Sequence, residues 1–491
     1  MGPRRSRKEA SVNTPVPSAT ATDPTTLSLR EALAFLDDRI AGRVLIPGDP
    51  GWDEARSAWN LAIDQRPAAV VIAADAADVA RTVRTAKGLG LAVAPQATGH
   101  NAGPLAARDG LADAILLRTH ELRGVEVDAE SRIARVEAGA QWGDVVAAVA
   151  PLGLTALAGS SHDVGVVGYT LGGGISWLAR SHGVAANHVV AIDVVTADGM
   201  ARRVDAEHDA ELFWALRGGG GDFGVVTALE FRLFDVPALS AGMLLWSIER
   251  TADVMAAWSA WTADLPASVT SLVRALRLPP MPELPPFLSG RSLVVVEVAM
   301  QEDPARVDEL LAPLRALAPE VDTVHPQNSD ELLQLHMDPP QPTPGYGDGM
   351  LLAELPPAAI RAFVDEAGPD SSSALLSAEI RHLGAMMRPG VARAAASAQG
   401  RPEPGVTAGI DAGYLVFGVG IAMPGNADAL AESLGRLLAR VEPWRAGTDY
   451  LNFAEHSRLP ERFFGDDLER LRAVKQAVDP TKVIRSNHPV G

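Results

Sequence analysis

Glycine-rich segments constrain this chain more strongly than any other feature of its sequence. Residues 157–174 read LAGSSHDVGVVGYTLGGG, and residues 218–224 read GGGGDFG. A shorter turn, PQATGHN, occupies residues 95–101. Glycine allows a main chain to approach a ligand where a Cβ atom would clash, and successive backbone N–H groups form concavities that bind anions. We therefore interpret the three segments as loops that lie close to a dinucleotide.

The simplest alternative is that these glycines only form turns, which would be the preferred interpretation of a single loop. Three such loops within one domain favour a nucleotide cofactor instead. Residues 219–224 match the pattern GxGxxG, but the expected helix 211–216 precedes them and the expected strand 225–233 follows, which reverses the order of a Rossmann site. The glycines of residues 165–174 are too dense for a helix interior, where each costs about 1 kcal/mol.

Composition excludes several classes of partner. The 491 residues carry a formal net charge of −18, which disfavours nucleic acid and anionic membranes because both are bound through clustered Lys and Arg. The sequence contains no cysteine, which removes disulfides and thiolate metal sites and fits a reducing cytoplasm. No window approaches the roughly 20 apolar residues of a membrane span. Residues 1–26 are basic at first and then rich in Ser, Thr and Pro, so we expect a disordered leader.

The order of expected helices and strands predicts an α+β protein of two domains. Apolar runs predict strands at residues 69–73, 91–94, 114–117, 124–127, 133–138, 189–197 and 225–233, and helices at 29–40, 76–87, 140–149 and 209–216. Asp75 would cap the second helix and Gly88 would end it. Proline clusters at 279–286 and 339–344 mark loops beyond residue 239, where strands at 292–300 and 414–422 alternate with helices such as 428–438. An amphipathic helix ends before Pro480.

Motifs spread along the chain carry a family resemblance. They are QATGH at 96–100, GVVGYTLGGG at 165–174, VTADG at 195–199, FWALRGGGGDFGVVT at 213–227, YLNF at 450–453, and the Asp-Pro pair at 479–480. With them the chain resembles the berberine bridge enzyme-like group of FAD-linked oxidases, within the vanillyl-alcohol oxidase / p-cresol methylhydroxylase (PCMH) superfamily. The resemblance covers about residues 43–490.

The resemblance implies a domain boundary near residue 239, beyond which the sequence contains the two proline clusters. A two-lobed PCMH-type FAD-binding domain would occupy residues 27–238, with its core at about 66–237. A substrate domain with an antiparallel sheet backed by helices would occupy residues 239–443. Residues 444–491 would form a C-terminal segment that returns to the FAD domain.

The same resemblance implies which residues hold FAD. His100 matches the histidine that bonds covalently to a ring methyl of the flavin, and imidazole is a suitable nucleophile near neutral pH. An ordinary loop histidine is the alternative. Ser161 stands where many relatives carry a second linking cysteine, so we expect a monocovalent flavin. The implied cofactor-binding residues are Gln96, Ala97, Thr98, Gly99, His100, Asn101, Ser160, Ser161, Val164, Gly165, Gly168, Tyr169, Gly172, Gly173, Gly174, Val225, Val226, Tyr450 and Asn452.

The catalytic base is the point at which this sequence departs from the family. Oxidising relatives end the YxNY motif in a tyrosine base, but Phe453 stands there and cannot exchange a proton. On an extended segment, Tyr450 and Asn452 would share one face while Phe453 faces the substrate. Glu379, His382 or Tyr450 could serve as the base, although Glu379 and His382 could equally belong to a charged surface strand. Otherwise the substrate ionises unaided, or the reaction is not a redox reaction.

One leading hypothesis and one alternative follow. We expect an FAD-dependent oxidase that takes a hydride from a small alcohol, sugar or secondary-metabolite intermediate and passes the electrons to O₂. The alternative is a non-redox flavoprotein on the same scaffold, either a cyclase or a ligand-sequestering resistance protein. No metal is expected, because His336 and Asp338 alone are too few ligands.

Overall fold

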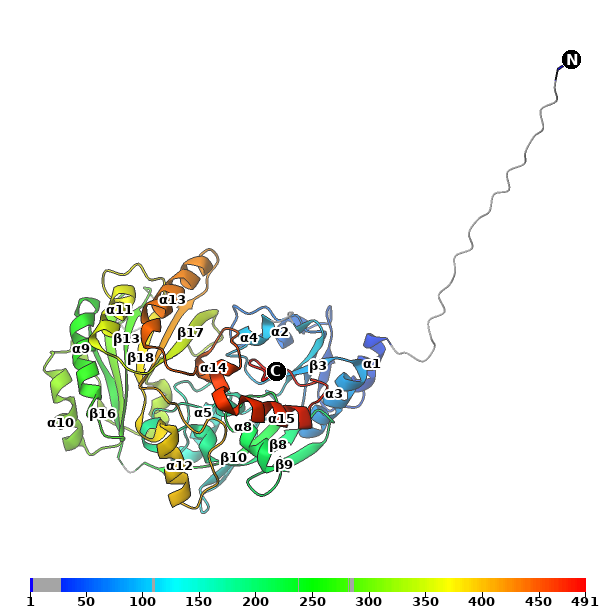
Figure 1. Ribbon diagram of the computed structural model, residues 1–491, viewed down its shortest axis with the longest axis horizontal. Helices are drawn as coiled ribbons and strands as arrows, with labels where there is room; N and C mark the ends of the chain where they lie inside the picture. The colour runs from blue at the N-terminus through cyan, green and yellow to red at the C-terminus, as the bar shows by residue number, and fades with distance from the viewer. Residues whose placement is uncertain (3–27, 108–110, 237, 281, 283–286) are drawn as a thin grey trace.

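The computed structural model describes residues 1–2, 28–107, 111–236, 238–280, 282 and 287–491. Most of the predicted leader at 1–26 and part of the proline cluster 279–286 therefore lie outside the described residues. The described chain forms two lobes built on separate sheets, and its C-terminal segment lies across one of them (Figure 1). Helices and strands alternate throughout, which confirms the predicted α+β class.

The first sheet has the order β1 (Arg43–Leu45), β2 (Ala69–Ile72), β4 (Ala114–Arg118), β3 (Ala92–Gln96). Strands β2, β4 and β3 run parallel and are almost entirely buried, as their apolar runs predict. Helices α1 (Leu29–Asp37) and α3 (Ala76–Leu89) pack against them. Asp75 caps α3 as predicted, but the predicted stop at Gly88 is wrong. A single exposed glycine costs a helix only about 1 kcal/mol, and α3 ends at Gly90 in a left-handed conformation.

The second sheet is antiparallel, with the order β5 (Val125–Asp128), β6 (Ile133–Glu137), β10 (Val225–Arg232), β8 (Val189–Val195), β9 (Ala201–Val204). Helices α5 (Trp142–Val149) and α8 (Ala210–Leu216) share its core, which contains the fully buried Trp142 and Phe213. Shorter elements connect the sheets: α2 (Trp52–Arg56), α4 (Gly103–Ala106), α7 (Ala179–His182), β7 (Leu154–Thr155) and β11 (Phe234–Asp235).

The central glycine-rich stretch contains a helix, contrary to the prediction that its glycines are too dense for one. Helix α6 (Val166–Leu171) begins after Gly165 and ends at Gly172, so Gly168 is its single internal glycine. The cost of one glycine, about 1 kcal/mol, is small beside the burial of the flanking Val166 and Leu171, which pack in the core of the second sheet. The glycines at 173 and 174 follow the helix at φ angles of 114° and 80°, a region that favours glycine.

The second lobe contains an eight-stranded antiparallel sheet. Its order is β15 (Val321–Asp322), β12 (Ser240–Ser247), β14 (Ser292–Met300), β13 (Val269–Arg277), β18 (Ser377–His382), β19 (Tyr414–Ile421), β17 (Gly345–Leu352), with β16 (His325–Pro326) also on β12. Helices α9 (Thr251–Thr262), α10 (Pro304–Arg315), α11 (Pro357–Ala367) and α13 (Ala427–Val441) pack on one face. In Figure 1 helices α9, α10 and α11 lie on the side away from the first lobe, so the opposite face of the sheet looks toward it. Helix α12 (Pro389–Ala398) lies beyond β18 in the chain.

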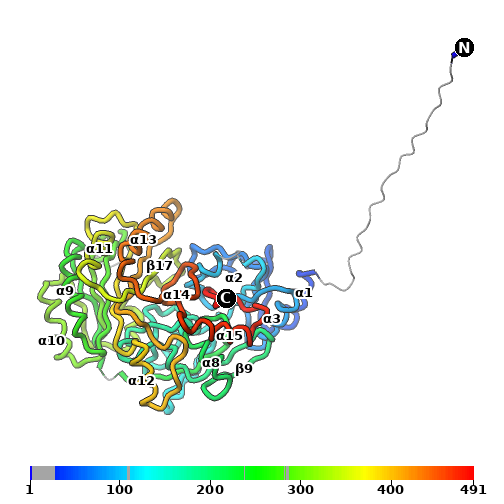
Figure 2. The backbone as a smooth tube through the Cα atoms, in the orientation of Figure 1, coloured from blue at the N-terminus to red at the C-terminus, as the bar shows by residue number. Residues whose placement is uncertain are grey.

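The C-terminal segment returns to the first lobe. After α13 the chain passes through α14 (Glu461–Phe464) and α15 (Leu468–Val478), which packs against α8. Residues 483–485 then run beside β3, where Val93 N donates to Val483 O at 2.7 Å and Arg485 N donates to Val93 O at 2.9 Å. Figure 2 shows this segment in red against the blue N-terminal lobe. No helix in the part of the chain that the structure describes is long and apolar enough to cross a membrane.

Candidate active site

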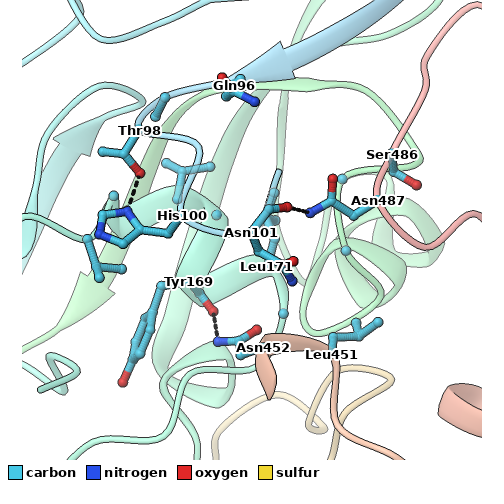
Figure 3. Close-up of a pocket in the computed structure, with 18 of the residues that line it drawn as sticks. Gln96, Thr98, His100, Asn101, Tyr169, Leu171, Leu451, Asn452, Ser486 and Asn487 are labelled. Carbon is cyan, nitrogen blue, oxygen red and sulfur yellow. Dashed lines mark hydrogen bonds between the residues drawn. The ribbon is translucent and has the colours of Figure 1, made fainter. Parts of the chain in front are cut away.

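A cavity of about 370 Å³ lies where the glycine-rich segments meet the C-terminal segment. The turn 95–101, residues from 159–175 and 220–226, and the C-terminal stretches 451–453 and 485–488 all contribute to its walls. Figure 3 shows His100 on one side of the cavity and Asn487 on the other, with Asn101 between them and Asn452 below. The structure thus brings together all three segments that the sequence singles out.

A buried arginine holds the turn 95–101 in place. Arg118, at the end of β4, donates from Nη1 to Gln96 Oε1 at 2.8 Å and from Nη2 to Ala97 O at 3.1 Å. Burial lowers the pKa of Arg118 to about 10, which still leaves it charged at neutral pH. Gly99 has φ of 86°, and a Cβ atom there would lie 2.9 Å from Ala58 Cβ. The turn therefore requires glycine both for its backbone conformation and for its close packing.

His100 lies on the cavity wall in a defined orientation. Its ring stacks on Trp59 with the centroids 4.1 Å apart, and its Nδ1 is 2.8 Å from Thr98 Oγ1. Its Nε2 is 3.4 Å from Asp163 Oδ1. Burial alone would raise the pKa of Asp163, but hydrogen bonds from His100, Ser161 and Trp59 outweigh burial and hold the pKa at about 2. A carboxylate and an aromatic ring thus fix the imidazole.

The central stretch and the C-terminal segment touch through a glycine. A Cβ atom at Gly172 would lie 1.6 Å from Asn452 Oδ1, and Asn452 Nδ2 donates to Tyr169 O at 2.9 Å. Residues 451–453 form a 3₁₀ turn, so the predicted extended segment is wrong. Phe453 nevertheless lines the cavity, as expected of a residue that faces the substrate.

Most of the predicted cofactor-binding residues line the cavity, and a minority do not. Those on its walls are Gln96, Ala97, Thr98, Gly99, His100, Asn101, Ser160, Val164, Gly165, Gly168, Tyr169, Gly172, Val226 and Asn452. Those outside its lining are Ser161, Gly173, Gly174, Val225 and Tyr450.

Tyr450 is placed differently from the sequence-based expectation. Its side chain is 5% exposed and packs in a cluster that also includes the cavity residues Ile175 and Phe453, and a Cβ atom at Gly173 would lie 2.4 Å from its hydroxyl oxygen. Burial raises the pKa of Tyr450 well above its usual range. The phenol therefore lies against the main chain at Gly173 and outside the cavity lining.

The polar side chains of β18 are buried, so the surface-strand alternative is wrong. Glu379 is 2% exposed and His382 is 9% exposed. Strand alternation places His382 on the side of Ile380, near Trp258 and Tyr414 and 3.0 Å from Arg180 Nη1. Burial and the charge of Arg180 lower the pKa of His382 to about 3. Neither Glu379 nor His382 lines the cavity.

Glu379 belongs to a buried ion network on the face of the sheet that looks toward the first lobe. Its Oε1 is 2.6 Å from Arg381 Nε, and its Oε2 is 3.2 Å from His336 Nε2. His336 Nδ1 in turn lies 2.7 Å from Glu297 Oε2. Although burial by itself raises the pKa of Glu379, the charges of Arg381 and His336 hold the pKa well below its usual range. Glu379 is therefore a paired carboxylate, unsuited to accept a proton near neutral pH.

Sequence reasoning missed two groups of cavity residues. Arg485, Ser486, Asn487 and His488 complete the wall opposite His100, and Asn487 Nδ2 donates to Asn101 O. No local pattern marks these residues, and only their return beside β3 brings them to the cavity. Arg381 is the second: strand alternation places it on the same face of β18 as Glu379, and it lines the cavity.

No group of three or more His, Cys, Asp or Glu side chains able to hold a metal ion occurs among the described residues. His336 and Asp338 lie 3.9 Å apart, but both belong to the ion network around Glu379, and Ser160 Oγ donates to Asp338. His336 and Asp338 thus belong to an ion-pair network.

Two family models match the chain at the segments that form the cavity. One, described as an FAD binding domain, matches residues 67–205, and the other, described as berberine and berberine like, matches residues 449–491. Through these two matches the chain is similar to the berberine bridge enzyme-like group of FAD-binding proteins. The resemblance predicted from the motifs is confirmed.

Individual relatives of this berberine bridge enzyme-like chain match it over part of their length. It is 34% identical to (R)-6-hydroxynicotine oxidase of Paenarthrobacter nicotinovorans over 209 residues, which make up 42% of this chain and 45% of that protein. It is 33% identical to glucooligosaccharide oxidase of Sarocladium strictum over 192 residues, 38% of each chain. The matched region thus spans half or less of these relatives.

Solved structures share the fold along almost the whole chain. Wild-type BBE-like 1 of Physcomitrella patens superposes with a TM-score of 0.80 at 20% sequence identity, covering 95% of this chain and 99% of that one. At this identity the likeness concerns the fold alone. It bears out the predicted combination of a PCMH-type FAD-binding domain and a helix-backed antiparallel sheet.

The cavity of this berberine bridge enzyme-like protein fits FAD on three observations. A Cβ atom at Gly168 or Gly221 would meet no atom within 4 Å, so main chain borders open space there. Asn101 Oδ1 is buried and has no hydrogen-bond partner among the described residues. No acidic side chain is among the described residues that line the cavity, which suits an anionic pyrophosphate.

Proposed function

We propose that this protein is an FAD-dependent oxidoreductase of the oxidase type. It would oxidise a small organic molecule, an alcohol, a sugar or a secondary-metabolite intermediate, and O₂ would take up the electrons. The observation that carries the proposal is the cavity itself, in which His100 and main chain from three glycine-rich segments face one open space. Oxidase names among the relatives support the same activity class.

We propose that His100 holds FAD covalently and that the cavity-lining residues of 96–101, 164–172 and 451–453 surround it. When bound, FAD supplies a two-electron acceptor for the hydride of the substrate. Trp59 and Asp163 orient the imidazole, and the main chain of α6 and the turn 95–101 lies close to the cofactor because glycine permits it. Phe453 excludes water from the substrate side of the cavity and exchanges no proton.

We propose domain boundaries that divide this work. Residues 27–238 would bind the cofactor, residues 239–443 would cover it with the eight-stranded sheet, and residues 444–491 would close the cofactor site. The C-terminal contacts beside β3 support the third assignment, because residues 485–488 line the cavity together with the turn 95–101. A cytoplasmic location is part of the proposal, supported by the absence of cysteine.

The test of the function begins with the visible spectrum of the purified protein, its acid precipitation and its intact mass. A yellow pellet and a mass increased by one FAD, both removed by His100→Ala, would support covalent attachment. Yellow colour that stays in the supernatant would contradict the covalent link and would still support binding of FAD. Thr98→Val is the matched control, since it removes a contact of the same ring and leaves the attaching atom in place.

A second candidate function is favoured by one observation, the phenylalanine at position 453. Without a tyrosine there, and with Tyr450, Glu379 and His382 outside the cavity lining, no predicted base reaches the substrate side. A non-redox flavoprotein, such as a cyclase or a ligand-sequestering protein, needs no such base. Anaerobic mixing with candidate substrates separates the two. Bleaching of the flavin supports the oxidase, and ligand binding without bleaching supports the second candidate.

A further inference from the structure

Arg381 occupies a singular place in the cavity wall. Among the described residues that line the cavity, it is the one contributed by the eight-stranded sheet, since all others come from residues 95–226 and 451–488. It lies on β18, and alternation along this strand directs Ile380 toward the helices and Arg381 toward the first lobe. Any molecule held between the sheet and the cofactor wall therefore meets this guanidinium group.

The buried ion network holds Arg381 through a single hydrogen bond of its guanidinium group. Its Nε donates to Glu379 Oε1 at 2.6 Å, and no hydrogen bond of its two Nη atoms is found among the described residues. Glu379 shares its charge with His336, which is itself paired with Glu297. The side chain of Arg381 is 14% exposed. A preorganised guanidinium with a free Nη edge is suited to the two oxygens of a carboxylate or to one ionised hydroxyl.

The surroundings of the free edge favour an anion. Glu297 and Asp338 also act electrostatically on Arg381, from positions outside the lining. No acidic side chain lines the cavity itself among the described residues, and the other cavity arginine, Arg485, is already paired with Asp113 at 2.6 Å. The Arg381 guanidinium carbon lies 4.9 Å from the ring centroid of Phe453, so a cation stands over the position that a tyrosine base would fill. An apolar ring beneath a guanidinium lowers the local dielectric and strengthens attraction of a negative charge.

We propose that Arg381 forms an anion subsite, and that the substrate is a small organic anion whose carboxylate or ionised hydroxyl binds the free Nη edge. This inference rests on the proposed function, because it takes the space between Phe453 and the cofactor wall as the substrate space. A hydroxyl that ionises against Arg381 has already lost its proton to solvent. It then needs no protein base, which is consistent with phenylalanine at position 453.

Isothermal titration of the purified holoprotein tests the subsite with benzoate and with its uncharged counterpart benzamide. We expect wild-type protein to bind benzoate at least about 10-fold more tightly than benzamide. Arg381→Gln should weaken benzoate about 10- to 100-fold and leave benzamide within about 2-fold. Equal affinity of the wild type for both probes, or equal benzoate affinity in the variant, would overturn the proposal. 4-Nitrophenol, titrated below and above its pKa, tells whether an ionised hydroxyl or a carboxylate is preferred.

Two further variants keep the test decisive. Arg381→Lys retains the charge without the planar fork, so it should keep part of the benzoate preference even if Arg381→Gln fails to fold. Arg306→Gln changes an exposed arginine of α10 paired with Glu309, and should leave both affinities unchanged. Flavin content measured on the same samples separates the two proposals. Colourless protein would contradict the proposed function. Yellow protein without a benzoate preference would contradict the anion subsite alone.

Discussion

The two walls of the cavity depend on different interactions. The cofactor wall consists of main chain brought close by glycine, as at Gly99 and Gly172, with few charges. The sheet wall is the face of the eight-stranded sheet that contributes Arg381 to the lining. Outside the lining, Arg274, Glu297 and Glu379 form a buried ion network with the imidazole of His336. The first wall depends on the absence of side chains and the second on their pairing. The cofactor wall is therefore sensitive to added atoms, and the sheet wall to removed charges.

The largest expected effect tests the sheet wall. Glu297 is fully buried and pairs with Arg274 at 2.6 Å and with His336 at 2.7 Å. Glu297→Gln removes the carboxylate partner of Arg274 and leaves His336 paired only with Glu379 and Asp338. The free energy of unfolding should then fall by about 3–5 kcal/mol. Urea denaturation followed by circular dichroism measures the change. Exchange of both Arg274 and Glu297 for apolar residues should recover most of the lost free energy of unfolding. A decrease below about 1 kcal/mol for Glu297→Gln would mean that the network contributes little to stability.

The next effect tests the cofactor wall with an added side chain. Gly99→Val places a β-branched residue at φ of 86° with its Cβ 2.9 Å from Ala58 Cβ, so we expect a loss of about 3 kcal/mol in stability together with loss of bound flavin. Thermal unfolding and the visible absorbance of the purified variant measure the two effects. Gly88→Ala is the matched control, since no atom lies within 4 Å of the added Cβ and α3 should gain up to about 1 kcal/mol. Normal flavin content in Gly99→Val would contradict this account of the turn.

The contrast between the walls also explains what the sequence could predict. The glycine-rich segments, Asp75 as a helix cap and the strands at residues 69–73 and 292–300 follow from local patterns, and the structure places them as expected. His100 lines the cavity, and its link to the flavin stays a prediction. The 3₁₀ turn at 451–453 and the cavity position of Arg381 depend on contacts between residues far apart in the chain. Glu297, Glu379 and His336 come from β14, β18 and the loop before β17, so no spacing in the sequence signals that they form one network.

A smaller effect concerns pH. Burial by itself would lower the pKa of His336, but the charges of Glu297, Asp338 and Glu379 outweigh burial and raise it to about 9, from about 6.5 in the unfolded chain. The folded state therefore binds the proton more tightly, and this stabilisation is complete below about pH 6.5 and is lost as pH rises through 9. We expect up to about 3 kcal/mol to disappear over this range. His336→Gln should flatten the profile, and an unchanged slope in that variant would assign the titration to another group.

The smallest effect separates Tyr450 from the cofactor wall. Its hydroxyl lies against the main chain at Gly173 and outside the cavity lining, so Tyr450→Phe should change stability by less than about 1 kcal/mol and leave flavin content and spectrum unchanged. Asn452→Ala is the informative partner, because it removes the donor to Tyr169 O on a residue that does line the cavity, and its flavin spectrum should shift. Flavin absorbance and its shift on adding benzoate would be compared in both variants. A spectral shift in Tyr450→Phe equal to that in Asn452→Ala would place the phenol beside the cofactor, and would show that side chains, as well as glycine main chain, form that wall.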